Sequence, residues 1–253
     1  MRFELLYNPA LFCERLAYKI WERRRLKRLR HTVAQTLSTG HIESLELLEA
    51  ARPLGINVIY DVGANVGTWA MLAKAVIPDV SVEAFEPLQN LHPEFKRNVS
   101  TLAGIRLHPV ALGSKSGEAA LHVMSLADAS SLLPLADASR SQFGVEEIEQ
   151  VPIQVRRMDE YRIERNLPLP DLIKLDVQGY ELEVLKGATE CLRAAKAVVV
   201  EVSFIEYYHK QCLFHSVVEF LAGFGLYLSV LGVNTPRGSA LQHCDVLFLR
   251  RMK

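Results

Sequence analysis

Four acidic residues stand at or near the ends of short apolar runs, where a folded chain could gather them into one site. They are Asp61, Glu86, Asp176 and Glu201. In an open α/β sheet, ligands bind beyond the carboxyl ends of the strands, near the point where the strand order reverses. A single carboxylate at a strand end is often a helix cap or a turn former. Four of them in successive units predict a polar crevice that binds a ligand.

A loop of small residues follows the first of these acids and reads Gly63-Ala64-Asn65-Val66-Gly67. Gly63 and Gly67 permit a tight turn and a close backbone approach to a ligand, at the point where a helix begins. The loop does not match the dinucleotide fingerprint GxGxxG, which would need glycine where Asn65 and Thr68 stand. Fewer glycines against the helix start favour a cofactor that has no pyrophosphate.

Glu86 ends the second apolar run and is a candidate ligand for a ribose. An ionised carboxylate has two acceptor oxygens, so it can accept hydrogen bonds from both ribose hydroxyls at once. Proteins that bind NAD place an acid at a similar position, so the position of Glu86 alone does not distinguish an NAD site from a site for an adenosyl cofactor. Together with the failed glycine pattern, Glu86 favours an adenosyl cofactor.

Apolar runs and helical stretches alternate along the middle of the chain, which is typical of βαβ units and of a mostly parallel sheet. The last two apolar runs are joined by a loop containing Gly and Pro, which predicts an antiparallel strand pair that closes the sheet. We therefore expect an α/β fold. The expected strands are 58–60, 80–85, 105–111, 172–175, 197–202, 226–231 and 246–249, and the expected helices include 67–76, 90–102 and 181–185.

Several motifs occur in a fixed order between residues 55 and 205. They are Asp61-Val62-Gly63-Ala64-Asn65-Val66-Gly67, Ala84-Phe85-Glu86-Pro87, Val110-Ala111-Leu112-Gly113, Ile173-Lys174-Leu175-Asp176-Val177-Gln178-Gly179-Tyr180-Glu181 and Leu185-Lys186-Gly187-Ala188. In this order the motifs resemble the FkbM family of S-adenosylmethionine-dependent methyltransferases. The resemblance implies a Rossmann-like, seven-stranded sheet, S-adenosylmethionine as the cofactor, and O-methylation of a hydroxyl on a sugar, a glycan or a natural-product small molecule.

The resemblance also implies a role for each motif residue at the cofactor. The loop after the first strand would line the methionine end, with Asp61 orienting it, and Glu86 would hold the ribose. Pro87 would fix the turn that aims Glu86, and Asp176 would lie near the sulfonium and the acceptor. The remaining cofactor-binding residues are Gly63, Ala64, Asn65 and Gly67 in the loop, with Val110 and Ala111 near the adenine.

An alcohol acceptor must lose its proton as it attacks, so we expect a general base. The candidates are Asp176 first, then Glu201, then His209. Asp176 could instead be a helix N-cap, Glu201 a buried partner of Lys174, and His209 an exposed loop residue. Many members of the family carry Glu where this chain has Gln178. An amide cannot accept the proton of the acceptor hydroxyl, so Gln178 is not a candidate base. Glu181 keeps a carboxylate nearby and could instead complement a helix N-terminus.

Two other functions fit parts of the sequence. The first is a protein that binds the cofactor without catalysing a reaction, which is indicated by Gln178 in place of a residue that could act as a base. It would bind S-adenosylmethionine with no turnover on any acceptor. An NAD-dependent oxidoreductase on a similar sheet is the second. It would need NAD binding and an acid or base for hydride transfer, and the sequence provides neither motif.

The sequence pattern predicts a basic, amphipathic helical extension over residues 1–52, followed by a methyltransferase domain over 53–253. Residues 15–30 hold eight basic residues against one acid, and Phe12, Leu16 and Ile20 recur at helical spacing beside them. This pattern predicts helix over 9–37, followed by a short helix at 42–50. The basic helix is either a solvated face packed on the domain or a peripheral contact with an anionic membrane or an anionic substrate.

Residues 117–154 fit no βαβ unit. Residues 121–124 could form a strand, and 125–150 are a polar insertion that we expect to form a substrate lid, with a disordered loop as the alternative. The 29 basic and 29 acidic residues cancel, which argues against a nucleic-acid partner. Four scattered cysteines predict no metal site and a reducing cytoplasm. No apolar run is long enough to span a membrane, so contact with the inner face of a membrane would be peripheral, through the basic helix.

Overall fold

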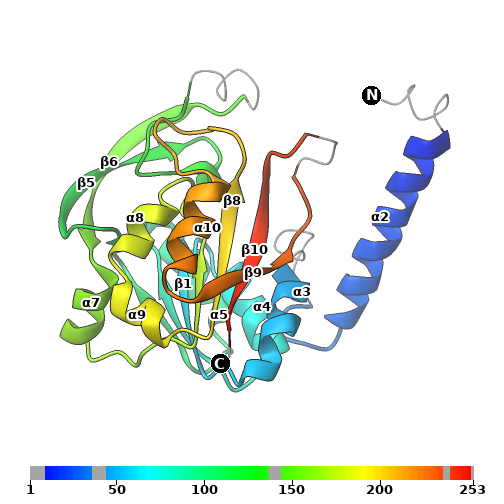
Figure 1. The fold of residues 1–253 in the computed structure, drawn as a ribbon, viewed down its shortest axis with the longest axis horizontal. Coiled ribbons are helices and arrows are strands. Elements are labelled where there is room, and N and C mark those ends of the chain that lie inside the picture. The colour runs from blue at the N-terminus through cyan, green and yellow to red at the C-terminus, as the bar shows by residue number, and fades with distance from the viewer. Residues whose placement is uncertain (1–8, 36–43, 137–143, 236–239, 252–253) are drawn as a thin grey trace.

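A seven-stranded sheet with helices on both faces forms the body of the molecule (Figure 1). The computed structural model describes residues 9–35, 44–136, 144–235 and 240–251. The strand order is β3-β2-β1-β7-β8-β10-β9, in which β10 is antiparallel to both of its neighbours and the other pairs are parallel. The strands are β1 (Val58–Val62), β2 (Ser81–Phe85), β3 (Ile105–His108), β7 (Leu172–Leu175), β8 (Ala197–Ser203), β9 (Leu226–Leu231) and β10 (His243–Arg250).

Two hydrophobic cores lie on opposite faces of this sheet. Alternate residues of each strand contribute to them, so that Ile59 of β1 packs on one side and Tyr60 on the other. The first core is covered by α3 (Ser44–Ala51), α4 (Thr68–Val76) and α5 (His92–Val99), with the 3₁₀ turns η1 (Arg52–Leu54) and η2 (Gln89–Leu91) beside them. The second is covered by α7 (Met158–Glu164), α8 (Glu181–Lys186), α9 (Thr189–Ala194) and α10 (Phe214–Ala222).

The strand order reverses between β1 and β7, because β2 and β3 lie on one side of β1 while β7 and β8 follow on the other. A crevice opens at such a reversal, since the loops after the two central strands leave in opposite directions. The carboxyl ends of β1, β2, β7 and β8 are therefore brought together. The fold confirms the expected mostly parallel sheet and its antiparallel C-terminal pair.

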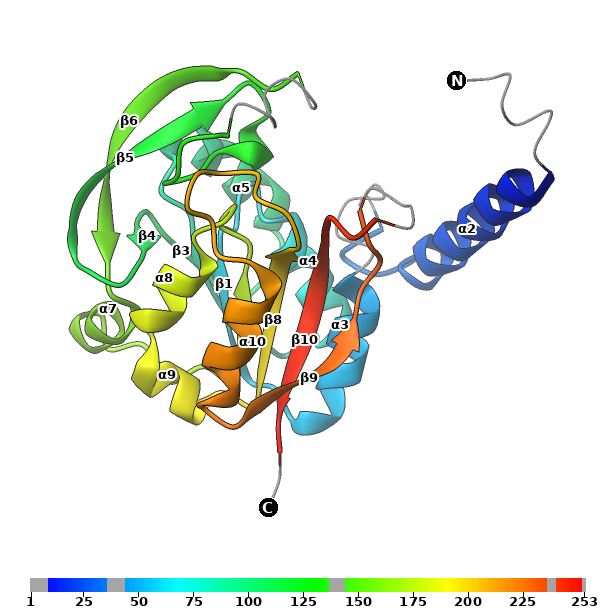
Figure 2. The same ribbon diagram turned by 45° about the horizontal axis from the view of Figure 1, so that its top comes forward.

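A second, three-stranded sheet in the order β4-β6-β5 arches over this end of the body (Figure 2). Its strands are β4 (Ala111–Leu112), β5 (Gly117–Met124) and β6 (Glu147–Arg156), with the 3₁₀ turn η3 (Ala127–Ala129) after β5. The expected insertion is therefore built on a β-hairpin, and its residues 137–143 lie outside the described residues. Residues 147–150, at the end of the expected insertion, form a strand that pairs with β5.

Two expected elements end earlier than their sequence pattern indicates. The strand expected over 105–111 breaks at Pro109, which cannot donate a ladder hydrogen bond, and residues 111–112 join the second sheet instead. The basic helix α2 spans Pro9–Arg28 and does not continue to residue 37. His31 adopts a φ of 67°, a left-handed conformation that ends the helical path. Residues 36, 37, 42 and 43 of the expected helices lie outside the described residues.

Candidate active site

A cavity of about 640 Å³ opens at the carboxyl ends of β1, β2, β7 and β8. This volume falls within the usual range for sites that bind small molecules. Its walls come from the loop after β1, from the turn after β2, from the loop after β7, and from the start of β10. Residues 126–135 of the insertion close it from the side of the second sheet, which is the place expected for a lid.

The loop after β1 is held against both neighbouring strands. Gly63 has a φ of 77°, and a Cβ atom there would lie 1.8 Å from the backbone oxygen of Asp176, so only glycine fits. The amides of Gly63 and Ala64 both donate to the carbonyl oxygen of Phe85 at 3.1 Å. Gly67 has a φ of 82° where a Cβ would meet the ring of Phe95 at 3.0 Å. The backbone of this loop is therefore pressed to the edge of the cavity.

Glu86 is a buried carboxylate that two backbone amides hold in place. Asn65 donates to its Oε2 at 2.9 Å and Leu88 donates to its Oε1 at 2.8 Å, so each oxygen keeps further acceptor capacity. Burial raises the pKa of Glu86 to about 7, although the two amides partly offset this effect. Glu86 lines the cavity beside the small-residue loop.

Lys174 ties the central strands together from the interior of β7. Its Nζ lies 3.2 Å from Asp61 Oδ1 and 3.6 Å from Asp176 Oδ2, and it donates to the carbonyl oxygen of Gly63 at 2.9 Å. Burial disfavours its charge, but Asp61 and Asp176 outweigh that penalty and raise the pKa of Lys174. The lysine is therefore a cation that fixes the loop after β1 and one carboxylate of the cavity.

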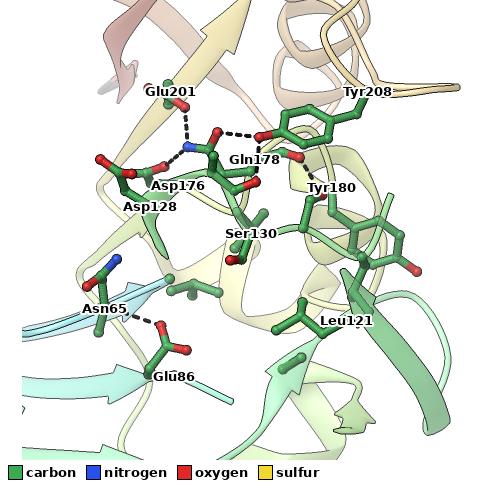
Figure 3. A pocket seen from close by; sticks show the side chains of 18 of the residues that line it. Asn65, Glu86, Leu121, Asp128, Ser130, Asp176, Gln178, Tyr180, Glu201 and Tyr208 are labelled. Carbon is green, nitrogen blue, oxygen red and sulfur yellow. Dashed lines mark hydrogen bonds between the residues drawn. The ribbon is translucent and has the colours of Figure 1, made fainter. Parts of the chain in front are cut away.

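Gln178 joins two carboxylates that the sequence analysis proposed as alternative bases (Figure 3). Its Nε2 donates to Asp176 Oδ1 at 2.9 Å and to Glu201 Oε2 at 3.0 Å. On its acceptor side, the Tyr208 hydroxyl lies 3.1 Å from Oε1. The backbone oxygen of Gln178 accepts a 2.6 Å hydrogen bond from Ser131 of the insertion. One amide side chain thus connects the carboxylates to the lid.

Glu201 and His243 face the cavity in electrostatic settings that suit proton transfer. Burial and then the neighbouring Asp176 and Asp245 raise the pKa of Glu201 well above its ordinary value. Burial lowers the pKa of His243, although Asp245 opposes this, so its imidazole is neutral at neutral pH. When ionised, Glu201 is therefore a stronger proton acceptor than an ordinary carboxylate, and the imidazole of His243 is a weaker base than an ordinary histidine.

Glu181 organises the loop between β7 and α8 and does not line the cavity. Its Oε1 accepts from the amides of Val177 at 3.1 Å and Gly179 at 3.0 Å. Burial raises the pKa of Glu181 to about 7. These contacts hold Gln178 with a φ of 55°, a backbone conformation that residues other than glycine rarely adopt. Glu181 acts on the site through the shape of this loop.

Most of the residues expected at the site line this cavity. The expected residues that line it are Gly63, Ala64, Asn65, Glu86, Pro87, Val110, Ala111, Asp176 and Glu201. Asp61 is buried behind them against Lys174, and Gly67 packs on Phe95 at the start of α4. His209 is exposed and stands outside the cavity lining, with its amide donating to Pro134. The structure therefore does not bring His209 to the carboxylates.

Tyr208 and His243 are cavity residues that sequence reasoning missed. The segment Glu206-Tyr207-Tyr208-His209 drew attention to its histidine, but the chain turns both tyrosines inward and leaves His209 outside. His243 and Asp245 precede the apolar run of β10 and are two residues apart, so they point to the same face. This alternation was the available signal for a polar wall formed by β10.

The cavity residues fit S-adenosylmethionine, the cofactor that the sequence analysis expects. The buried Glu86 offers both carboxylate oxygens to a ribose, and Val110 and Ala111 provide apolar wall for a flat base. Asp176 places a carboxylate in the same cavity, where it would stabilise the positive charge of a sulfonium. No group of metal-ligating side chains occurs among the residues that the structure describes.

Comparisons with known proteins agree with this arrangement. The model of the methyltransferase FkbM domain matches residues 61–226. A 2-O-methyltransferase NoeI from Sinorhizobium fredii is 27% identical over 193 residues, which are 74% of this chain and 78% of that protein. A hexuronic acid methyltransferase AglP from Haloferax volcanii is 30% identical over 58% of this chain, and the match spans 56% of that relative's length.

Among solved structures, a magnesium protoporphyrin IX methyltransferase from Synechocystis with bound SAM superposes with a TM-score of 0.47 at 12% identity. That superposition covers 82% of this chain and 76% of the other. The family model covers the loop after β1, Glu86, Lys174, Gln178 and Glu201, all of which meet at the cavity. The chain therefore belongs to the FkbM methyltransferase family, and its cofactor is S-adenosylmethionine.

Proposed function

We propose that this protein transfers the methyl group of S-adenosylmethionine to a hydroxyl of a sugar. The observation that carries the proposal is the pair of carboxylates, Asp176 and Glu201, that Gln178 holds together in the cavity beside the cofactor loop. O-methylation needs an aligned acceptor and a base for its proton, and this arrangement provides both. The printed names of NoeI and AglP, a 2-O-methyltransferase and a hexuronic acid methyltransferase, support a sugar as the acceptor.

The cofactor would be held by the residues at the carboxyl ends of β1, β2 and β3. Glu86 would accept the ribose hydroxyls, the Gly63–Asn65 loop would contact the methionine end, and Ala111 would contact the base. When bound, S-adenosylmethionine supplies a methyl group on a positively charged sulfur, which is already activated for displacement. The protein then has to align the acceptor, and alignment can lower the barrier by roughly 7–11 kcal/mol.

Glu201 is the residue that we propose as the base. Its raised pKa makes it a stronger base than an ordinary carboxylate. Asp176 sits 3.6 Å from the charged Lys174, which stabilises it as an anion that orients the acceptor hydroxyl. As the carbon–oxygen bond forms and the carbon–sulfur bond breaks, the hydroxyl proton passes to Glu201. The products are a methyl ether, S-adenosylhomocysteine and one proton, which later leaves to solvent.

Charge in the cavity narrows the acceptor class. Its acceptor side presents the carboxyl groups of Asp128, Asp176, Glu201 and Asp245, while Lys174 is already engaged by Asp61 and Asp176. A carboxylate on the acceptor would meet like charges there, and like-charge contacts at such a site cost several kcal/mol. We therefore propose a neutral or amino-bearing sugar as the acceptor, in preference to a uronic acid.

The experiment measures the transfer of a labelled methyl group from S-adenosylmethionine to matched neutral, amino and uronic sugars, with one sugar in each reaction. Glu201→Gln should lower kcat by roughly 10²–10⁴-fold, the usual contribution of a general base, and leave S-adenosylmethionine affinity unchanged. Glu219→Gln, on the exposed face of α10, is the matched control and should keep full kcat. Full kcat in Glu201→Gln would remove Glu201 from the mechanism. Tight cofactor binding without transfer to any hydroxyl would favour a non-catalytic binding protein.

A further inference from the structure

Helix α2 presents a side of apolar residues to solvent. Phe12, Leu16 and Ile20 follow one another at a spacing of four residues, which places them on one side of an α-helix. Their exposed fractions are 53%, 48% and 44%. The opposite side meets the domain, where Trp21 packs against the first core and Leu29 beyond the helix end is 3% exposed. The apolar side is therefore left uncovered by the described parts of this chain.

Basic residues continue the same side toward the C-terminal end of the helix. Lys19, Arg23 and Lys27 are exposed, and they follow Leu16 at spacings of three, seven and eleven residues. Other arginines of α2 have a different role, because Arg25 pairs with Glu46 and Arg28 with Glu49, both on α3. We call Phe12, Leu16, Lys19, Ile20, Arg23 and Lys27 the outer face of α2.

The position of α2 relates this outer face to the active site. Tyr18 of α2 is among the residues that line the cavity. Figures 1 and 2 both show α2 projecting from the body, with its N-terminal end at the same end of the molecule as the carboxyl ends of the central strands. The helix that carries the outer face therefore lies beside the cavity.

We infer that the outer face of α2 docks this protein on an anionic lipid bilayer. Apolar side chains next to lysine and arginine are the combination that places a helix at a membrane interface, where the rings and methyl groups enter and the cations meet anionic headgroups. A second copy of the same face would bring lysines and arginines into contact with each other, which is unfavourable. The inference goes beyond the proposed reaction, and it brings the cavity to acceptors that are carried on the lipid surface.

The test is sedimentation of the full-length protein with vesicles of phosphatidylcholine alone or with added phosphatidylglycerol. The wild type should partition onto the anionic vesicles, and this partition should weaken as salt is raised. Each basic residue near such a surface contributes about a fivefold gain in partition, so Lys19→Gln, Arg23→Gln and Lys27→Gln together should lower it about a hundredfold. The triple variant Phe12→Ser, Leu16→Ser and Ile20→Ser should abolish partition onto the anionic vesicles.

The matched control removes the same number of charges from other exposed sites, as Arg97→Gln with Arg165→Gln and Arg193→Gln. These residues lie on or next to α5, α7 and α9, and the control should retain wild-type partition. Titration with S-adenosylmethionine shows whether each variant is folded. Equal sedimentation with both kinds of vesicle, or an equal loss in the control, would overturn the inference. Formation of a dimer through α2 without vesicle binding would overturn it as well.

Discussion

The raised pKa of Glu86 predicts that cofactor affinity depends on pH in a defined way. In the free protein Glu86 titrates at about 7, because burial disfavours its charge. Ribose hydroxyls donate to the ionised form, so binding should select the carboxylate and release any proton that it carries. If the bound form is fully ionised, the observed Kd rises by the factor 1 + 10^(pKa − pH). This factor is about 2 at pH 7 and about 11 at pH 6.

The assay is calorimetric titration with S-adenosylmethionine between pH 5.5 and 8, in buffers that differ in ionisation enthalpy. At pH 7 about half of the free protein carries a proton on Glu86, so binding should release about 0.5 proton. Glu86→Gln is the matched variant, because it keeps the shape of the side chain but does not titrate. It should bind about 10- to 100-fold more weakly at pH 8, which is the effect of losing a hydrogen bond to a charged acceptor.

The comparison of the two proteins isolates Glu86, because ionisation of the cofactor itself affects both equally. The wild-type Kd should fall relative to that of the variant as pH rises from 5.5 to 8, and should then level off. A constant ratio across this range, or the same proton release in both proteins, would refute the assignment of Glu86 as the ribose ligand. It would also contradict the cofactor orientation on which the proposed reaction depends.

Three further predictions concern the loops that carry the site. Gln178→Glu would bring a third carboxylate into contact with Asp176 and Glu201, which should shift the pH profile of kcat to higher pH. An unchanged profile would show that Gln178 has only a structural role. Gly63→Ala should lower the free energy of unfolding in urea by about 2 kcal/mol or more, whereas Gly117→Ala, with open space around it, should change it by under about 0.5 kcal/mol. Glu181 has a raised pKa of about 7, so the folded state binds its proton more tightly than the unfolded state does. Its contribution to stability should therefore fall as pH rises from 4.5 to 7, and Glu181→Gln should flatten the change of Tm over that window.

The sequence predicted that the loop after β1 and Glu86 come together at the cavity, because local pattern determines their positions. A tight glycine turn after an apolar run, and an acid at the end of the next run, both depend on neighbours close in the chain. Gly63 shows the limit of such reasoning, since its contact with the backbone of Asp176 joins residues far apart in sequence. The pattern indicated a turn, and only the folded sheet shows why no larger residue fits.

The acceptor half was harder to predict, because it is assembled from separate segments. Gln178 was interpreted as a loss of chemistry, whereas the fold makes it the link between two carboxylates and the insertion. His209 was expected at the site and Tyr208 was not, because which of two adjacent residues faces inward depends on how the loop packs on residues 129–135. The hairpin of the insertion was missed because the first half of β6 is largely exposed, and apolar residues alternate only from Val151 to Val155.

The most direct test of the proposed function is to incubate the protein with S-adenosylmethionine carrying a deuterated methyl group and a set of neutral, amino and uronic sugars. Mass spectrometry and NMR of the products then locate the label. We predict a deuterated methyl ether on a hydroxyl oxygen of a neutral or amino sugar, formed by the wild type and by Glu219→Gln but scarcely by Glu201→Gln. Label confined to an amine nitrogen or to a uronic carboxylate would contradict the account.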